Sequence, residues 1–121
     1  MSTHNLVASL RHLQQRRKRL LEECLRNKEL VVGTVSELRA RCGKPGCRCA
    51  SGPGHPQMRL LYAEAGRRRC KLIRKADEER IRAAGQRYRQ LRSDLRELAA
   101  LNSREIRLLR ELIRRRGLRY E

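Results

Sequence analysis

The feature that most constrains this chain is a sixteen-residue segment, residues 42–57, in which Gly or Pro recurs every few positions. The segment holds all three of the chain's prolines and four of its eight glycines, so neither a helix nor a regular strand can run through it. It must form a loop, and regular elements lie on either side of it. The same loop carries three cysteines and a histidine: Cys42, Cys47, Cys49 and His55.

These four side chains predict a metal site. Thiolate sulfur and imidazole nitrogen are ligands that zinc prefers, and four of them in one tight loop fit tetrahedral coordination. Four residues separate Cys42 from Cys47, which differs from the two-residue spacing of common zinc fingers. The prediction rests instead on crowding, because three cysteines within eight positions are hard to explain as packing in a polar loop. An iron–sulfur cluster, a redox-active thiol set and inert cysteines are the alternatives.

The sequence leaves the fourth ligand open between His55 and Cys70. If Cys70 is not a ligand, we expect it, like Cys24, to be a small buried hydrophobic residue. The loop contains no carboxylate, and Glu64 is the only one in the segment that follows, so a general base beside the metal is missing. We therefore expect a structural zinc site and no enzyme activity.

Two kinds of periodicity flank the loop. Apolar residues recur at three- and four-residue intervals over residues 6–28, which predicts an amphipathic N-terminal helix. Residues 30–41 become β-branched and predict a short strand that leads into the loop. Beyond the loop, residues 58–64 and 69–74 predict two antiparallel strands joined by a turn at Ala65-Gly66.

From about Asp77 the pattern is helical for the rest of the sequence. Its apolar residues have the spacing of a coiled-coil seam, which comprises Ile81, Ala84, Tyr88, Leu91, Leu95, Leu98, Ile106, Leu109 and Ile113. Asn102 and Ser103 interrupt the seam, either as a stutter in one helix or as a break between two. A seam this long needs the N-terminal helix, a second copy, or both as its partner. We expect a homodimer or a helical partner protein.

Together these elements predict an α+β fold that is mostly α. It has an N-terminal helix, a small antiparallel hairpin or three-stranded sheet with a zinc-knuckle loop, and a long coiled-coil-like C-terminal helix. The corresponding segments are residues 1–29, 30–75 and 76–121, with a break near residue 102 as an alternative. Because the chain has 2% aromatic residues, its core is thin, and a metal, paired helices or a partner must add stability.

No segment approaches the roughly twenty consecutive apolar residues of a membrane span. The start of the chain has no charged region leading into an apolar run, so we expect no signal peptide. Five cysteines are an odd number, which favours thiols or metal ligands in a reducing compartment over disulfides. These features predict a cytoplasmic protein that associates with the nucleoid or another nucleoprotein.

The charge of the chain indicates a polyanionic partner. Thirty-one Lys and Arg residues against thirteen Asp and Glu residues give a net charge of +18. Residues 31–75 are the most cationic part, with eleven basic and two acidic residues. These eleven are the candidate phosphate contacts: Arg39, Arg41, Lys44, Arg48, Arg59, Arg67, Arg68, Arg69, Lys71, Arg74 and Lys75.

The motif Cys42-Gly-Lys-Pro-Gly-Cys-Arg-Cys, followed by His55, resembles that of a family of short bacterial proteins of unknown function. Members share a Cys-Gly-Lys-x-x-Cys-x-Cys signature, a small sheet and a long C-terminal helix, and the likeness spans roughly residues 30–115. They are small and basic and often accompany mobile elements and transposase genes. The resemblance implies a nucleic-acid setting and assigns no reaction.

We therefore expect a non-enzymatic, zinc-stabilised nucleic-acid-binding protein, accessory to a mobile element or to another nucleic-acid-processing machine. Three tyrosines are the only aromatic residues, so stacking on single strands is weak, and duplex DNA is favoured, with structured RNA as the alternative. A second hypothesis is a helical adaptor that docks on a transposase, recombinase or other nucleoprotein enzyme. A third is a thiol enzyme or redox sensor.

Overall fold

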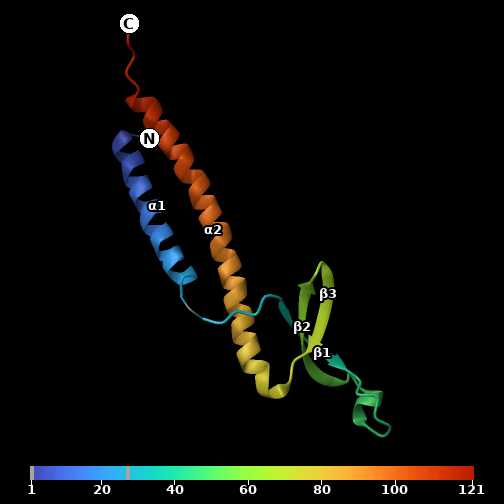
Figure 1. The fold of residues 1–121 in the computed structure, drawn as a ribbon. Coiled ribbons are helices and arrows are strands. Elements are labelled where there is room, and N and C mark those ends of the chain that lie inside the picture. Colours follow the sequence, from blue (N-terminus) through green and yellow to red (C-terminus); the bar gives the residue numbers. More distant parts are fainter. Residues whose placement is uncertain (1, 27) are drawn as a thin grey trace. The chain divides into compact units, whose positions relative to one another are not determined.

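The structure is a computed structural model that describes residues 2–26 and 28–121. Met1 and Asn27, which fall in the predicted N-terminal segment 1–29, lie outside the described residues. The elements follow in the order α1 (Thr3–Cys24), β1 (Thr34–Ala40), β2 (His55–Glu64), β3 (Arg67–Leu72) and α2 (Glu78–Arg116) (Figure 1). Short 3-10 helices at Arg48–Ser51 and Lys75–Asp77 complete the fold. The predicted α+β class, with a three-stranded sheet, a Cys-rich loop and a long C-terminal helix, is confirmed.

The chain forms two compact units. The helical unit combines α1 with residues 90–121, and the sheet unit comprises residues 28–89. The helix α2 therefore contributes its first turns to the sheet unit and the rest to the helical unit. The segments predicted from the sequence follow the order of the elements along the chain, whereas these units group the elements that contact one another.

Helix α1 begins and ends earlier than predicted. Ser2 is its N-cap, and the Ser2 hydroxyl accepts a hydrogen bond from the backbone N–H of Asn5 at 3.1 Å. The helix ends at Cys24 instead of near residue 28, because hydrophobic periodicity marks the face of a helix better than its ends. Its core residues Leu6, Leu13 and Leu20 are all buried and lie seven residues apart.

Helix α2 continues through Asn102 and Ser103 over 39 residues, so the segment is one long helix and not the alternative with a break near residue 102. Acidic residues in its first turn and basic residues in its last turn complement the helix dipole. No helix among the described residues combines the length and apolar content that crossing a membrane requires.

In the helical unit, α1 lies alongside the C-terminal part of α2 (Figure 1). Two ion pairs join them: Arg16 donates to both carboxylate oxygens of Glu97 at 2.7 and 2.9 Å, and Arg17 donates to Glu105 at 2.6 Å. The seam predicted for α2 is partly wrong, because Leu95 and Ile113 are 55% and 71% exposed. The less exposed row instead comprises Leu91, Asp94, Leu98, Leu101, Glu105, Leu108 and Leu112.

The sheet unit has strand order β1-β2-β3, and both strand pairs are antiparallel. The first turns of α2 pack against one face of this sheet. A Cβ added at Gly85 of α2 would lie 3.0 Å from Cγ2 of Val35 in β1, so an alanine there would require the Val35 side chain to move by a few tenths of an ångström. Arg82 of α2 also donates to Sδ of the buried Met58 in β2 at 3.2 Å.

The hairpin turn at Ala65-Gly66 is confirmed, and both residues have positive φ, of 50° and 76°. β2 begins at His55, however, three residues earlier than the predicted strand. The predicted loop over residues 42–57 is therefore wrong in its last residues, which pair with the end of β1. Two prolines suggest a loop from sequence alone, but Pro56 lies opposite Arg39 in the ladder between β1 and β2.

Candidate metal centre

The Cys-rich loop leaves β1 at Ala40 and enters β2 at His55, and these two residues are directly paired in the sheet. The pairing brings the two ends of the loop together. Between them, Gly54 has φ of 92°, and a Cβ there would lie 2.6 Å from the backbone carbonyl carbon of Ala40. Only glycine fits this position, so Gly54 sets how His55 approaches the cysteines.

Inside the loop, a turn and a 3-10 helix position the sulfur atoms. The backbone N–H of Cys47 donates to the carbonyl of Lys44 at 3.3 Å, which closes a turn before the 3-10 helix Arg48–Ser51. Cys49 lies in this short helix and is buried. Gly43 and Gly46 both have positive φ, of 76° and 78°.

The four predicted ligands converge. One ligand atom from each of Cys42, Cys47, Cys49 and His55 lies within 4.8 Å of all the others. Sγ of Cys42 is 3.3 Å from Sγ of Cys49, and Sγ of Cys47 is 3.2 Å from Nε2 of His55. A tetrahedral metal with bonds of about 2.3 Å to sulfur places its sulfur ligands about 3.8 Å apart. The cluster could therefore hold a metal ion.

The structure brings His55, and not Cys70, together with the three cysteines of the loop. Cys70 lies in β3, opposite Leu61 of β2, and its side chain is exposed instead of buried as expected. The other cysteine outside the cluster, Cys24, is half-buried in α1.

The two neighbouring thiols have opposite pKa shifts. Hydrogen bonding to the backbone of Lys44, and then to the thiols of Cys49 and Cys47, lowers the pKa of Cys42 to about 6. At Cys49 the backbone N–H of Cys42 favours the thiolate, but the neighbouring Cys42 sulfur and burial outweigh it, and the pKa of Cys49 is raised. Cys42 is thus a thiolate at neutral pH, which is the form that binds metals.

The predicted phosphate contacts fall into three groups. The first surrounds the metal cluster, where Arg41, Lys44 and Arg48 are exposed and Arg39 donates to the carbonyl of Gly54 at 3.2 Å. The second group lies on β3, all of whose residues are exposed, and comprises Arg67, Arg68, Arg69 and Lys71. None of these four has an ion pair within the described part of the chain.

The remaining three residues, Arg59, Arg74 and Lys75, differ in exposure and in their partners. Arg59 of β2 is half-buried and donates to Oε1 of Gln57 at 3.0 Å, and Arg74 forms an ion pair with Asp77 at 3.2 Å. Lys75, next to Arg74, is exposed. Because side chains alternate along strands and directly paired residues share a face, Arg69 lies on the same sheet face as Tyr62. The nitrogen Nζ of Lys71 lies over the ring of Tyr62, 5.5 Å from its centroid.

The sequence analysis did not identify Gly54 as a site residue. Glycine is required at position 54 because this residue lies close to the backbone of Ala40, fourteen residues earlier in the sequence. Patterns within a single sequence do not show which residues that far apart are in contact. The available signal was a glycine directly before the candidate ligand His55.

An α+β scaffold with a Cys3His cluster at one end of a small sheet defines a protein built around a candidate metal centre. The model of one family, described as a domain of unknown function (DUF6788), matches residues 10–83. The chain belongs to this family. The matched residues include the Cys-rich loop and the whole sheet. The resemblance to a family of unknown function is confirmed to that extent. No curated protein and no solved structure matches the chain.

Proposed function

We propose that this chain is a non-enzymatic nucleic-acid-binding protein whose Cys-rich loop is stabilised by zinc. The observation that carries the proposal is the position of the Cys3His cluster at the end of a sheet whose edge strand β3 is strongly cationic. In this proposal the metal and the basic residues have separate roles. The metal stabilises the loop, and the basic residues bind phosphates.

The ligand set favours zinc. Three thiols and one imidazole are a typical donor set for structural zinc sites, which are closed because the protein supplies all four ligands. The thiolate of Cys42 supports metal binding at neutral pH. Zinc in small modules contributes folding free energy on the order of 10 kcal/mol or more. The same closure argues against a catalytic metal, which needs a position open to water.

Nucleic acid is the polyanion that best fits the exposed cations of β3 and the loop. A two-stranded β-ribbon fits the major groove of a duplex, and the end of the β2–β3 hairpin, where Tyr62–Glu64 pair with Arg67–Arg69 beyond the last residue paired with β1, forms such a ribbon. Among the aromatic residues, Tyr120 is almost fully exposed but lies near the C-terminus, outside the sheet, so a stacking platform for single strands is weak. Duplex DNA is therefore the favoured target, and structured RNA is the alternative.

The biological setting that we propose is an accessory role for a mobile element or another nucleic-acid-processing machine, at the nucleoid. It rests on the motif resemblance of the Cys-rich loop and on the net charge of +18. The proposal names no reaction.

A salt titration of duplex binding tests the proposal. Each phosphate contact adds about 0.9 to the slope of log affinity against log salt concentration. Replacing the four basic residues of β3 with Gln should therefore reduce that slope by about 3.6 if each of them contacts one phosphate. A matched variant replaces four other basic residues with Gln: Arg104, Arg107, Arg110 and Arg119. This variant should change the slope much less. Equal losses in both variants would contradict the β3 site, and no binding at low salt would contradict the function.

A further inference from the structure

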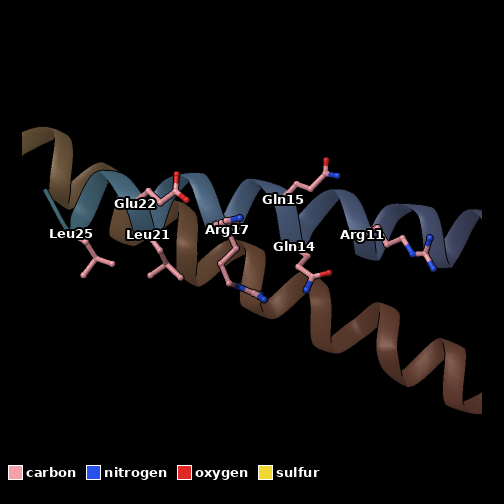
Figure 2. A pocket seen from close by; sticks show the side chains of 8 residues that line it. Arg11, Gln14, Gln15, Arg17, Leu21, Glu22 and Leu25 are labelled. Atoms are coloured by element: carbon pink, nitrogen blue, oxygen red, sulfur yellow. The ribbon is translucent and has the colours of Figure 1, made fainter.

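The helical unit has an apolar groove along one side. It consists of two adjoining hollows that share Arg11, Gln14 and Arg17. Both helices line the first, with Val7 and Leu10 on α1 and Leu109 and Leu112 on α2. The second is lined by α1, including Leu21, and by its C-cap residue Leu25. Figure 2 shows Leu21, Leu25 and Arg17 on one side of α1, with Glu22 and Gln15 on the opposite side. Leu21 and Leu25 therefore line the second hollow from one side of α1, and Gln15 and Glu22 line it from the other.

Three leucines that line this groove are more exposed than leucines that form a helix–helix contact. Leu21, Leu25 and Leu109 are 43%, 80% and 41% exposed, although Leu6, Leu13 and Leu20 already form the buried contact of α1. Two helices form a single layer, which leaves its sides open. The groove residues of α1 extend from Val7 to Leu25, about 27 Å along the helix, which matches a partner helix of about 18 residues.

The charges around the groove indicate which charge a partner would carry. Arg11, Lys18 and Arg116 line it, whereas Glu22 and Glu105 are its only acidic lining residues in the described chain. Glu105 already accepts a hydrogen bond from Arg17. The groove is therefore electropositive, and its apolar residues lie between positive charges.

Arg17 adds a second, independent observation. Its Nε and Nη2 atoms are buried and have no hydrogen-bond partner within the described residues, because Glu105 engages only Nη1. Buried donors without acceptors cost free energy. Because both atoms are buried, a carboxylate in the groove would accept hydrogen bonds from them only after the guanidinium rotates toward it.

We propose that this groove binds an amphipathic helix of a partner protein, with apolar residues at three- and four-residue intervals and Asp or Glu along its flanks. A second copy of this chain fits less well, because each copy carries +18 and would place cations against the cationic groove. The groove belongs to the helical unit, whereas the proposed nucleic-acid contacts belong to the sheet unit, so the two proposals can fail separately.

The probe is a synthetic helical peptide of about 18 residues with Leu on one face and Glu at the flanking positions. Two control peptides carry Lys in place of Glu, or the same residues in scrambled order. Binding to the full-length protein is measured by fluorescence anisotropy at about 150 mM salt, where distant charges are screened. The amphipathic Glu peptide should bind, and the Lys peptide and the scrambled peptide should not. Equal binding of the scrambled peptide would show general charge attraction and overturn the proposal.

Groove variants and control variants test whether the peptide binds in the groove. Leu21→Gln with Leu25→Gln should weaken peptide binding about tenfold or more, because two apolar contacts are lost. The matched control, Leu61→Gln with Leu72→Gln, changes two exposed leucines of the sheet unit and should leave the affinity unchanged. Arg11→Gln with Lys18→Gln should weaken binding roughly threefold without altering the apolar surface. Equal losses in groove and control variants would overturn the proposal.

Sedimentation velocity tests whether a second copy of this chain, and not a partner protein, occupies the groove. We expect the protein alone to sediment as a monomer, and we expect the peptide to cause no dissociation. A stable dimer that the Leu21→Gln and Leu25→Gln variant dissociates would place a second copy in the groove and overturn the proposal. Circular dichroism of each variant confirms that its helices are retained, which the exposure of Leu21 and Leu25 leads us to expect.

Discussion

Sγ of Cys42 lies 3.3 Å from Sγ of Cys49, and the backbone N–H of Cys42 donates to that same Cys49 sulfur at 3.3 Å. Cys42 follows β1, whereas Cys49 lies in the 3-10 helix of the loop, so these contacts fold the loop back on the end of the sheet. Without a metal, two sulfur atoms this close cannot both ionise easily. A bound cation would remove that conflict, because it neutralises both thiolates.

The first prediction concerns the metal itself. Purified protein should contain one zinc ion per chain, and Cys49→Ser should reduce the content well below one, because it removes a buried ligand. Elemental analysis measures the content. Cys70→Ser is the matched control, since Cys70 is outside the cluster, and it should retain the metal. Iron in place of zinc, or full metal content in Cys49→Ser, would contradict the assignment.

The second prediction concerns the reactivity of Cys42 in metal-free protein. Because its pKa is lowered to about 6, its thiolate should form as pH rises through that value. The rate of alkylation by iodoacetamide, followed by mass spectrometry of the Cys42 peptide, should rise with a midpoint near pH 6. Addition of zinc should suppress the reaction at neutral pH. A midpoint near the ordinary value of 9.0 would show that the hydrogen bonds around Cys42 do not form in solution.

The third prediction tests the close approach of Gly54 to Ala40. Gly54→Ala introduces a Cβ 2.6 Å from backbone at a φ of 92°, so the loop must move. We expect a loss of about 2 kcal/mol or more in unfolding free energy, measured by chemical denaturation, together with weaker zinc binding. Gly46→Ala is the control: its φ is also positive, but a Cβ there meets nothing within 4 Å. It should cost only about 1 kcal/mol, the strain of the left-handed backbone.

The fold and the candidate site could be predicted only in part from the sequence. Periodicity predicted both long helices and the hairpin, recurrent Gly and Pro predicted most of the loop, and crowding of cysteines predicted the metal site, because each is a local pattern. The inner row of α2 was predicted only at Leu91 and Leu98, because it also contains Asp94 and Glu105, which a hydrophobic pattern excludes. Asp94 is tolerated there because it accepts a hydrogen bond from Gln90, and Glu105 because it pairs with Arg17.

Local sequence pattern also could not decide which residue is the fourth ligand. His55 and Cys70 were both compatible with the sequence, and only strand register separates them. His55 pairs with Ala40 at the end of the sheet where the loop begins, whereas Cys70 pairs with Leu61 nearer the hairpin turn. Register depends on contacts between strands, which a single sequence does not report.

The fourth prediction concerns acid stability of the helical unit. The hydrogen bonds from Arg16, and then its charge, hold the pKa of Glu97 below its usual value of 4.5. Because the folded state binds the proton more weakly than the unfolded chain, this pair stabilises the fold above about pH 4.5 and is lost as pH falls below it. The melting temperature, followed by circular dichroism, should therefore fall on acidification.

Replacement of Glu97 isolates this contribution. Glu97→Gln should lower the melting temperature at neutral pH and reduce the further fall below pH 4.5, because the variant has no proton to bind at this position. Glu22→Gln is the matched control, since Glu22 is an exposed acid of α1 without an ion pair in the described chain, and it should keep the full acid dependence. If Glu97→Gln and the unmodified protein fall in parallel, the Arg16–Glu97 pair does not join the two helices in solution.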